Sequence, residues 1–263
     1  MKIRIVDNFL LVDGDNLFYR IRYALNSVDL DEILKGIRTS IRFLEGKFLD
    51  NFNKMIIVWD AGHSGRNKIL ATYKKQRQNK PIEELKEISE LKKLVKYALS
   101  NDDGYINFEI KGYECDDIIA SFVNLITKFT NLRVVIVSED KDFLQLISKN
   151  CVLFRPVRNR ECSLSNFKEI TGLNEPKDYI KYLAIVGDRV DGIPGISGIG
   201  EKRAKLYLTN KNKLSKHILD KIESEKEIYN LCYKLVKFKK KIYNKHNEIR
   251  HLIMSLGIKL KCL

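Results

Sequence analysis

The sequence predicts an α/β fold with a mostly parallel central sheet, and three observations lead to this prediction. Apolar runs typical of buried strands occur at 10–12, 55–59 and 132–137. Segments with helical spacing of apolar residues lie between them, as in residues 31–50. Strands that alternate with helices usually form parallel sheets. With 263 residues, of which 44% are hydrophobic, the chain is long enough to bury a substantial core.

Shorter elements complete the predicted sheet. A short strand is expected at 105–110, and another at 151–154. We expect the second to lie at an edge of the sheet, because Pro156 ends it. Further helices are expected where apolar residues recur at helical spacing, at 82–98, 142–147, 163–186 and, in a lysine-rich stretch, from 209 onward.

Acidic residues follow three of the predicted strands. Asp13 and Asp60 each come directly after a strand, and Asp140 and Asp142 lie just beyond the strand that ends at Val137. The carboxyl ends of parallel strands meet at the crevice where α/β sheets bind ligands. One such aspartate is usually a turn or cap residue. Three strands that end this way favour a cluster of carboxylates around metal ions.

A fourth group of acids begins a helix. Glu114, Asp116 and Asp117 stand in the stretch 112–121, where an apolar helical run starts. Acids in a first helical turn gain about 1 kcal/mol or less from the helix dipole, whereas clustered carboxylates repel one another. A solvated, acid-rich helix start is one interpretation. The acids at the strand ends favour the other, in which divalent cations neutralise the cluster.

The charge balance points to a polyanionic partner. The chain carries 48 basic and 34 acidic residues, a net charge of +14. A basic body around an acidic pocket suits a nucleic acid whose phosphate is held by metals. Tyr73, Lys74 and Arg77 suit a single strand, by base stacking and phosphate pairing. A basic surface that serves solubility, and a solvated helix face at this segment, are the alternatives.

A glycine-rich segment predicts a second nucleic-acid contact. The spacing of glycines before a basic helix indicates a helix-hairpin-helix motif at about 183–208, in which phosphate approaches backbone N–H groups at a helix N-terminus. Two more acids, Asp188 and Asp191, precede these glycines. The residues expected to contact DNA here are Gly195, Gly198, Gly200, Lys202 and Arg203.

The remaining composition indicates an intracellular protein, or one that is delivered without a secretory signal. The five cysteines form no C-x-x-C pair, so we expect reduced thiols in the cytoplasm and neither a zinc site nor a disulfide framework. No stretch approaches the ~20 apolar residues of a membrane span. Met1 leads almost directly into the first strand, so no secretory signal and no membrane association are expected.

Together these motifs resemble the structure-specific 5′-nucleases, which include flap endonucleases and the 5′–3′ exonuclease domain of bacterial DNA polymerase I. The motifs that carry the resemblance are Leu11–Gly14, Trp59–Asp60, Gly112–Asp117, Ser138–Asp142 and Gly187–Gly200. The resemblance implies a PIN-like or resolvase-like core over 1–160, with a helical arch at about 66–104. A helical subdomain that carries the hairpin would follow at 161–263.

The resemblance also implies two divalent-metal sites that hold two or three Mg²⁺ or Mn²⁺ ions. The first would be formed by Asp13, Asp60, Glu114 and Asp116. The second would be formed by Asp140, Asp142 and Asp188, with Asp116 between the two and with Asp117 and Asp191 as supporting acids. Cys115 stands where the family usually has a small residue, and we expect it to pack without binding metal.

The DNA-binding residues implied by the resemblance come from two regions. Lys74 and Arg77 match the family's catalytic cations, acting with Asp116 and Asp142, and Tyr73 matches its stacking tyrosine. Residues 78–104 would form the arch that a free 5′ strand passes through or under. Backbone carbonyls of the hairpin, at Ile196 and Ile199, would bind a monovalent cation such as K⁺.

The implied function is metal-dependent hydrolysis of DNA at 5′ flaps and 5′ ends, in replication and repair, with 5′-phosphate products. The partner would be a flapped or branched duplex, or an RNA primer paired with DNA, and the protein would act as a monomer. Three alternatives stay open: a PIN-type single-strand ribonuclease, a non-catalytic protein that binds DNA junctions, and a Mg²⁺-dependent phosphatase. The hairpin, the retained carboxylates and the excess of basic residues, respectively, argue against them.

Overall fold

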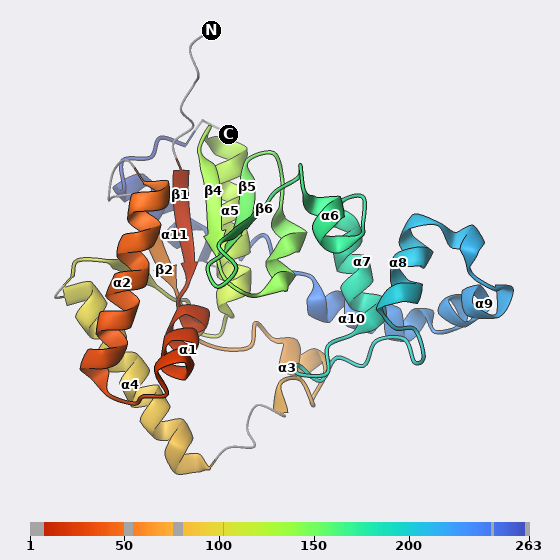
Figure 1. Cartoon of the computed structure of the whole chain (residues 1–263), viewed down its shortest axis with the longest axis horizontal. Coiled ribbons are helices and arrows are strands. Elements are labelled where there is room, and N and C mark those ends of the chain that lie inside the picture. The colour runs from red at the N-terminus through yellow and green to blue at the C-terminus, as the bar shows by residue number, and fades with distance from the viewer. Residues whose placement is uncertain (1–7, 50–54, 76–80, 102, 243–244, 261–263) are drawn as a thin grey trace, which may run out of the picture.

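A six-stranded sheet forms the centre of the molecule (Figure 1). The computed structural model describes residues 8–49, 55–75, 81–101, 103–242 and 245–260. The strand order is β3-β2-β1-β4-β5-β6, and only β6 runs antiparallel to its neighbour. The strands are β1 (Asn8–Asp13), β2 (Met55–Val58), β3 (Ile106–Phe108), β4 (Arg133–Val137), β5 (Cys151–Arg155) and β6 (Arg160–Cys162).

Helices cover both faces of this sheet, and further helices lie to one side of it (Figure 1). The helices of the first half are α1 (Gly14–Leu25), α2 (Leu30–Phe48), α3 (Arg66–Ile69), α4 (Ile82–Asn101), α5 (Cys115–Phe129) and the 3₁₀ helix η2 (Lys141–Leu146). Those of the second half are α6 (Phe167–Thr171), α7 (Pro176–Val186), α8 (Glu201–Thr209), the 3₁₀ helix η3 (Lys211–Lys213), α9 (Lys216–Ser224), α10 (Lys226–Val236) and α11 (His246–Ser255). Among the described helices, none is both long and apolar enough to cross a membrane.

Alternation along β1 shows how the two faces are filled. Phe9 and Leu11 belong to the core that includes α5, whereas Leu10 and Val12 belong to the core that includes α1, α2 and α4. All four side chains are fully buried, as expected for a central strand of a parallel sheet that is covered on both faces. β1 lies between β2 and β4. The chain adds β2 and β3 on one side of β1 and then β4 and β5 on the other, and ligands of α/β sheets bind at such a switch point.

The predicted strands are confirmed, with one difference at the end of the sheet. β5 is not an edge strand, because β6 pairs with it. Pro156 does end β5, but it begins a turn in which the Asn159 amide donates to the Pro156 carbonyl at 3.1 Å. Asn159 adopts a left-handed conformation with φ of 43°, and the chain returns as a hairpin.

The helix expected within the arch, α4, lies partly against the core. The C-terminal part of α4 buries Ile88, Leu91 and Val95 against the core formed with α1 and α2. Only the first turns of α4, from Ile82, stand clear of this core. The arch over about 66–104 stays a prediction, and residues 76–80 and 102 of this range lie outside the described part.

The lysine-rich stretch near the C-terminus is not helical throughout. After α10 the chain continues as an irregular segment, and we call this segment together with the last two residues of α10, residues 235–239, the strap. Phe238 in the strap is buried, with its ring 5.5 Å from that of Phe143. Its amide donates to Gln145 Oε1 at 3.1 Å, and Gln145 Nε2 donates to the Val236 carbonyl at 3.0 Å. One hydrophobic core contains residues from both halves, so the predicted boundary at residue 161 marks no break in packing.

Candidate active site

A pocket of about 450 Å³ lies at the carboxyl ends of β1, β2 and β4, beside the N-terminus of α5. Among the described residues, ten carboxylates and three cationic side chains line it. The cations are Arg20, Arg66 and Lys74. The carboxylates are Asp13, Asp15, Asp60, Glu114, Asp116, Glu139, Asp140, Asp142, Asp188 and Asp191. The fold thus brings together eight of the nine acids expected to bind metal.

The first carboxylates are fixed by the ends of the sheet strands. Asp13 ends β1 and caps α1: its Oδ1 accepts the Asn16 amide at 3.0 Å, and its Oδ2 accepts the Ser138 hydroxyl at 2.8 Å. Asp60 accepts the Cys115 amide at 2.6 Å, which ties it to the first turn of α5. Asp116 stands in that same turn. Strand ends and a helix start therefore place these three acids around one space.

The second group comes from η2 and from the glycine-rich loop. Asp140 caps η2 by accepting the Asp142 amide at 2.8 Å. Asp188 accepts the Val190 amide at 2.7 Å, which shapes the loop before the hairpin glycines. The Asp191 carbonyl accepts the Lys74 amide at 2.9 Å, so the loop contacts the segment that follows α3. The loop and the sheet thus contribute to the same pocket.

The pocket holds more negative charge than its own residues neutralise. Burial, and then the charges of Asp15 and Asp60, raise the pKa of Asp13 to about 7. Burial, and then the charge of Asp15, raise the pKa of Asp60 to about 6. Burial and the charge of Asp140 raise the pKa of both Asp116 and Asp142 well above the usual range. Such a set of oxygen donors fits Mg²⁺ or Mn²⁺.

Removal of divalent ions should make stability depend on pH in a definite direction. An unfolded aspartate titrates near 3.8, while Asp13 and Asp60 titrate near 7 and 6 in the folded protein. Between these values the folded state binds more protons than the unfolded state, so stability falls as pH rises. In EDTA, the melting temperature is expected to fall between about pH 4 and about pH 7. Mg²⁺ should reduce or reverse this fall, and a fall of equal size with Mg²⁺ would contradict a metal site here.

A buried ion-pair network forms one wall of the pocket. Glu114 Oε1 accepts the Lys74 ammonium at 2.6 Å, and Oε2 accepts Arg66 Nη1 at 2.6 Å. The Tyr73 hydroxyl lies 3.2 Å from Glu114 Oε1. Burial lowers the pKa of Lys74, but the charges of Glu114, Tyr73, Asp116 and Asp191 together raise it, so the ammonium stays charged. Glu114 therefore fixes the Lys74 ammonium in the pocket, whether or not it also binds a metal ion.

Two family models match consecutive parts of the chain. Residues 8–172 match the family model described as "5'-3' exonuclease, N-terminal resolvase-like domain". Residues 174–255 match that described as "5'-3' exonuclease, C-terminal SAM fold". The chain belongs to the 5′-3′ exonuclease family. Its enzymatic class, its resolvase-like core and its helical C-terminal part agree with the resemblance seen in the sequence.

Individual relatives cover most of the chain. A 5′-3′ exonuclease of Aquifex aeolicus is 34% identical over 86% of this chain and 80% of its own length. Among solved structures, a 5′-exonuclease of T5 with bound zinc has a TM-score of 0.78 at 22% identity, covering 95% of this chain and all of its own. A flap endonuclease of phage T5, in a complex with DNA and metal ions, has a TM-score of 0.76 at 22% identity, covering 95% and 99%. These two structures show that the fold is shared.

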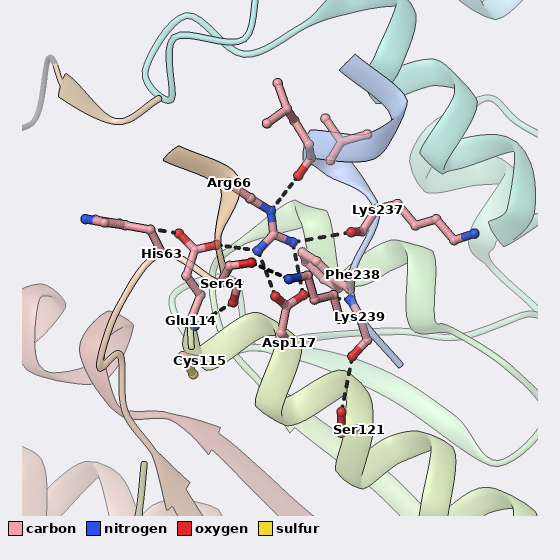
Figure 2. A network of polar contacts seen from close by, with 12 residues as sticks. His63, Ser64, Arg66, Glu114, Cys115, Asp117, Ser121, Lys237, Phe238 and Lys239 are labelled. Carbon is pink, nitrogen blue, oxygen red and sulfur yellow. Dashed lines mark hydrogen bonds and ion pairs between the residues drawn. The ribbon is translucent and has the colours of Figure 1, made fainter. Parts of the chain in front are cut away.

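Two predicted roles in this 5′-3′ exonuclease are not supported. Asp117 does not line the pocket: it is fully buried, and its oxygens accept Arg66 at 2.8 and 3.0 Å and the Lys239 amide at 2.7 Å (Figure 2). Tyr73 lines the pocket but is only 7% exposed, so little of its ring is open to a stacking base. A buried tyrosine hydroxyl needs a partner, and Glu114 provides it.

The hairpin residues fall into two groups. Gly195 is buried, and a Cβ there would lie 2.4 Å from the Val186 carbonyl oxygen, so this glycine serves close packing rather than phosphate contact. The other four residues expected to contact DNA are exposed: Gly198, Gly200, Lys202 and Arg203. The Ile196 carbonyl accepts the Ile199 amide at 3.0 Å within this turn. Arg77 lies outside the described residues.

Several pocket residues were not predicted from the sequence. Asp15 lies in the first turn of α1, and its oxygens accept the Asp60 amide and the Lys92 ammonium, each at 2.7 Å. Tyr19 and Tyr23 line the pocket with their rings stacked at 6.1 Å, and Tyr23 is 60% exposed. Their i, i+4 spacing just after Asp13 was the available signal.

Cys115 packs as predicted. It is buried, and its Sγ lies 3.3 Å from the Val58 carbonyl oxygen and 3.8 Å from Asp13 Oδ1. Burial and the charge of Asp13 raise the pKa of this thiol well above its usual value. Because the thiolate is the form that binds metals, Cys115 is a poor ligand in this protonated state.

Proposed function

We propose that this 5′-3′ exonuclease hydrolyses DNA phosphodiesters at 5′ ends and 5′ flaps with the help of divalent metal ions, in replication and repair. The observation that carries the proposal is the convergence of eight predicted carboxylates from β1, β2, α5, η2 and the glycine-rich loop on one pocket. Their charge exceeds that of the surrounding cations, which favours metal binding over direct contact with a polyanion. A junction-binding protein without metals would repel DNA there.

The residues divide into two metal sites that share one acid. Asp13, Asp60 and Asp116 would hold the first ion, with Glu114 at its edge. Asp140, Asp142, Asp188 and Asp191 would hold the second, with Asp116 between the two. Divalent ions supply Lewis-acid chemistry, polarising the phosphoryl group and making a water more acidic. Mg²⁺ is the ion that we propose, with Mn²⁺ as its substitute.

Other residues would position the substrate. The Lys74 ammonium, held by Glu114, would pair with the phosphate and stabilise the charge that develops on it. Arg77 would assist it. Tyr19 and Tyr23 would take the stacking role first given to Tyr73, because a nucleotide must leave the duplex to reach the carboxylates. That requirement favours frayed ends and flaps over intact duplex.

The hairpin would hold the duplex by its backbone. Gly198 and Gly200 leave open space where a phosphate can approach, and Lys202 and Arg203 lie exposed on the next turn. Such contacts give selectivity for structure rather than sequence. A K⁺ ion bound by the carbonyls of Ile196 and Ile199, an RNA primer as substrate, a monomeric state and a cytoplasmic location remain predictions.

The test compares a 5′-flap DNA with a matching RNA flap, each with Mg²⁺ and with EDTA. We expect Mg²⁺-dependent cutting near the DNA junction that leaves a 5′ phosphate, and no cutting in EDTA. Cutting of single-stranded RNA alone would instead favour the PIN-type ribonuclease. Tight binding of flap DNA without cutting, with Mg²⁺ and Mn²⁺ alike, would favour the non-catalytic junction binder.

A further inference from the structure

Arg66 lies enclosed where three distant parts of the chain meet (Figure 2). Its side chain is 3% exposed, and it connects the start of α3, the start of α5 and the strap. All five N–H donors of the guanidinium have an acceptor. Nε donates to the Leu235 carbonyl at 2.7 Å, Nη1 to Glu114 at 2.6 Å and Asp117 at 2.8 Å, and Nη2 to Asp117 at 3.0 Å and the Lys237 carbonyl at 3.3 Å.

These contacts lead directly into the pocket. Arg66 holds Glu114 Oε2, and the other oxygen of the same carboxylate holds the Lys74 ammonium. The Glu114 amide donates to the Ser64 hydroxyl at 2.9 Å, so the residue is fixed at its backbone as well. The Lys239 ammonium donates to the Ser64 carbonyl, which ties the strap to the same turn. An unbroken series of bonds thus joins the strap to Lys74.

We propose, on the basis of the function proposed above, that Arg66 is a positioning residue of the nuclease site. It orients Glu114, and through Glu114 it orients Lys74, while the strap carbonyls fix the guanidinium itself. Lysine cannot replace it, because an ammonium has three donors on a flexible stem and lacks the planar fork that matches two carboxylates and two carbonyls. Arg66 and Lys74 also balance Glu114 and Asp117, so the buried network carries no net charge.

Gln145 provides a matched control. It is buried like Arg66, and its side-chain amide makes two hydrogen bonds with the strap. It donates to the Val236 carbonyl and accepts from the Phe238 amide. Gln145→Met therefore loosens the strap without removing a bond from Glu114. Arg66→Lys also loosens the strap, and in addition it removes the planar guanidinium that holds Glu114. The difference between the two variants isolates the effect on the active site.

The experiment measures single-turnover cleavage of 5′-flap DNA with Mg²⁺, DNA affinity without metal, and melting temperature. We expect R66K to cleave about 10²-fold more slowly than wild type, since a misplacement of about 1 Å has an effect of that size. Its DNA affinity should stay within about threefold, because Arg66 is buried. The melting temperature of Q145M should fall by about as much as that of R66K, but Q145M should cleave within about threefold of wild type. In an E114Q background, R66K should add little further loss, because the two residues act in series.

The outcomes separate this inference from the function on which it rests. Failure of the wild-type protein to cleave any flap would reject the proposed function, and the role of Arg66 with it. If the wild type cleaves, equal rates for R66K and wild type would overturn the inference alone. Equal losses in R66K and Q145M would also overturn it, since Arg66 would then act only by holding the strap. Should R66K not fold, R66Q takes its place with the same expectations.

Discussion

Replacing Asp116 with asparagine is expected to abolish flap cleavage, by at least about 10³-fold, while leaving DNA affinity nearly unchanged. Asp116 stands between the two proposed metal sites, so its loss weakens both. Its charge interacts with those of Asp140 and Asp60, and its pKa is raised by burial and by these neighbours. An amide of the same shape removes one buried charge from this group. The metal-free D116N protein should therefore melt at a higher temperature than wild type, although it is inactive.

Asp103→Asn serves as the control for this substitution. Asp103 pairs with Arg38 at 2.9 Å on the surface, away from the pocket, and such exposed pairs contribute about 1 kcal/mol or less. D103N should cleave like wild type and should not gain stability in EDTA. The measurements are cleavage rates with Mg²⁺ and melting temperatures with EDTA. Full cleavage by D116N would rule out the shared metal site.

Replacing Gly195 with alanine is expected to destabilise the hairpin severely, by about 3 kcal/mol or more. Gly195 has a φ of 67°, a conformation that residues with a Cβ rarely adopt. The added Cβ would also lie 2.4 Å from the Val186 carbonyl oxygen and 2.7 Å from the Gly187 nitrogen. These atoms belong to the backbone, which has little room to move. The hairpin loop carries Asp188 and Asp191, so cleavage should fall together with stability.

The same hairpin offers a control at Gly200. This residue has a φ of −81°, and a Cβ there would meet nothing within 4 Å. Gly200→Ala should therefore change the free energy of unfolding by less than about 1 kcal/mol. Denaturant unfolding of both variants measures the contrast. Equal stability of G195A and G200A would show that Gly195 does not pack as described.

The sequence predicted the parts of the site that local patterns determine. An apolar run followed by aspartate placed Asp13 and Asp60 correctly, because a parallel sheet aligns all such strand ends. It did not distinguish Asp116 from Asp117, which are adjacent in sequence but differ by about 100° around a helix. Which of the two faces the pocket depends on Arg66, 51 residues away from Asp117 in sequence. Such a pairing leaves no local signal.

Long-range partners also explain the other differences from prediction. Tyr73 resembles a stacking residue because basic residues lie next to it in the sequence. Its hydroxyl is nevertheless buried against Glu114, 41 residues later. The run 237–241 is dense in lysine and favours a solvated helix. Phe238 within it is instead buried against Phe143, and the amides of Phe238 and Lys239 donate to Gln145 and Asp117 rather than to helical carbonyls. Helix α4 is amphipathic as predicted, and its apolar face packs against the core formed with α1 and α2.

The strap also bears on the order in which the molecule assembles. The bond from Arg66 to Leu235 closes a sequence separation of 169 residues, whereas each parallel strand pair can form from much earlier parts of the chain. Contacts across such long separations form slowly, because the entropy of closing the loop must be overcome first. A newly made chain would therefore complete its sheet before Arg66 finds its carbonyl acceptors. On the function proposed above, full cleavage activity would therefore require a contact that is among the last to form during folding.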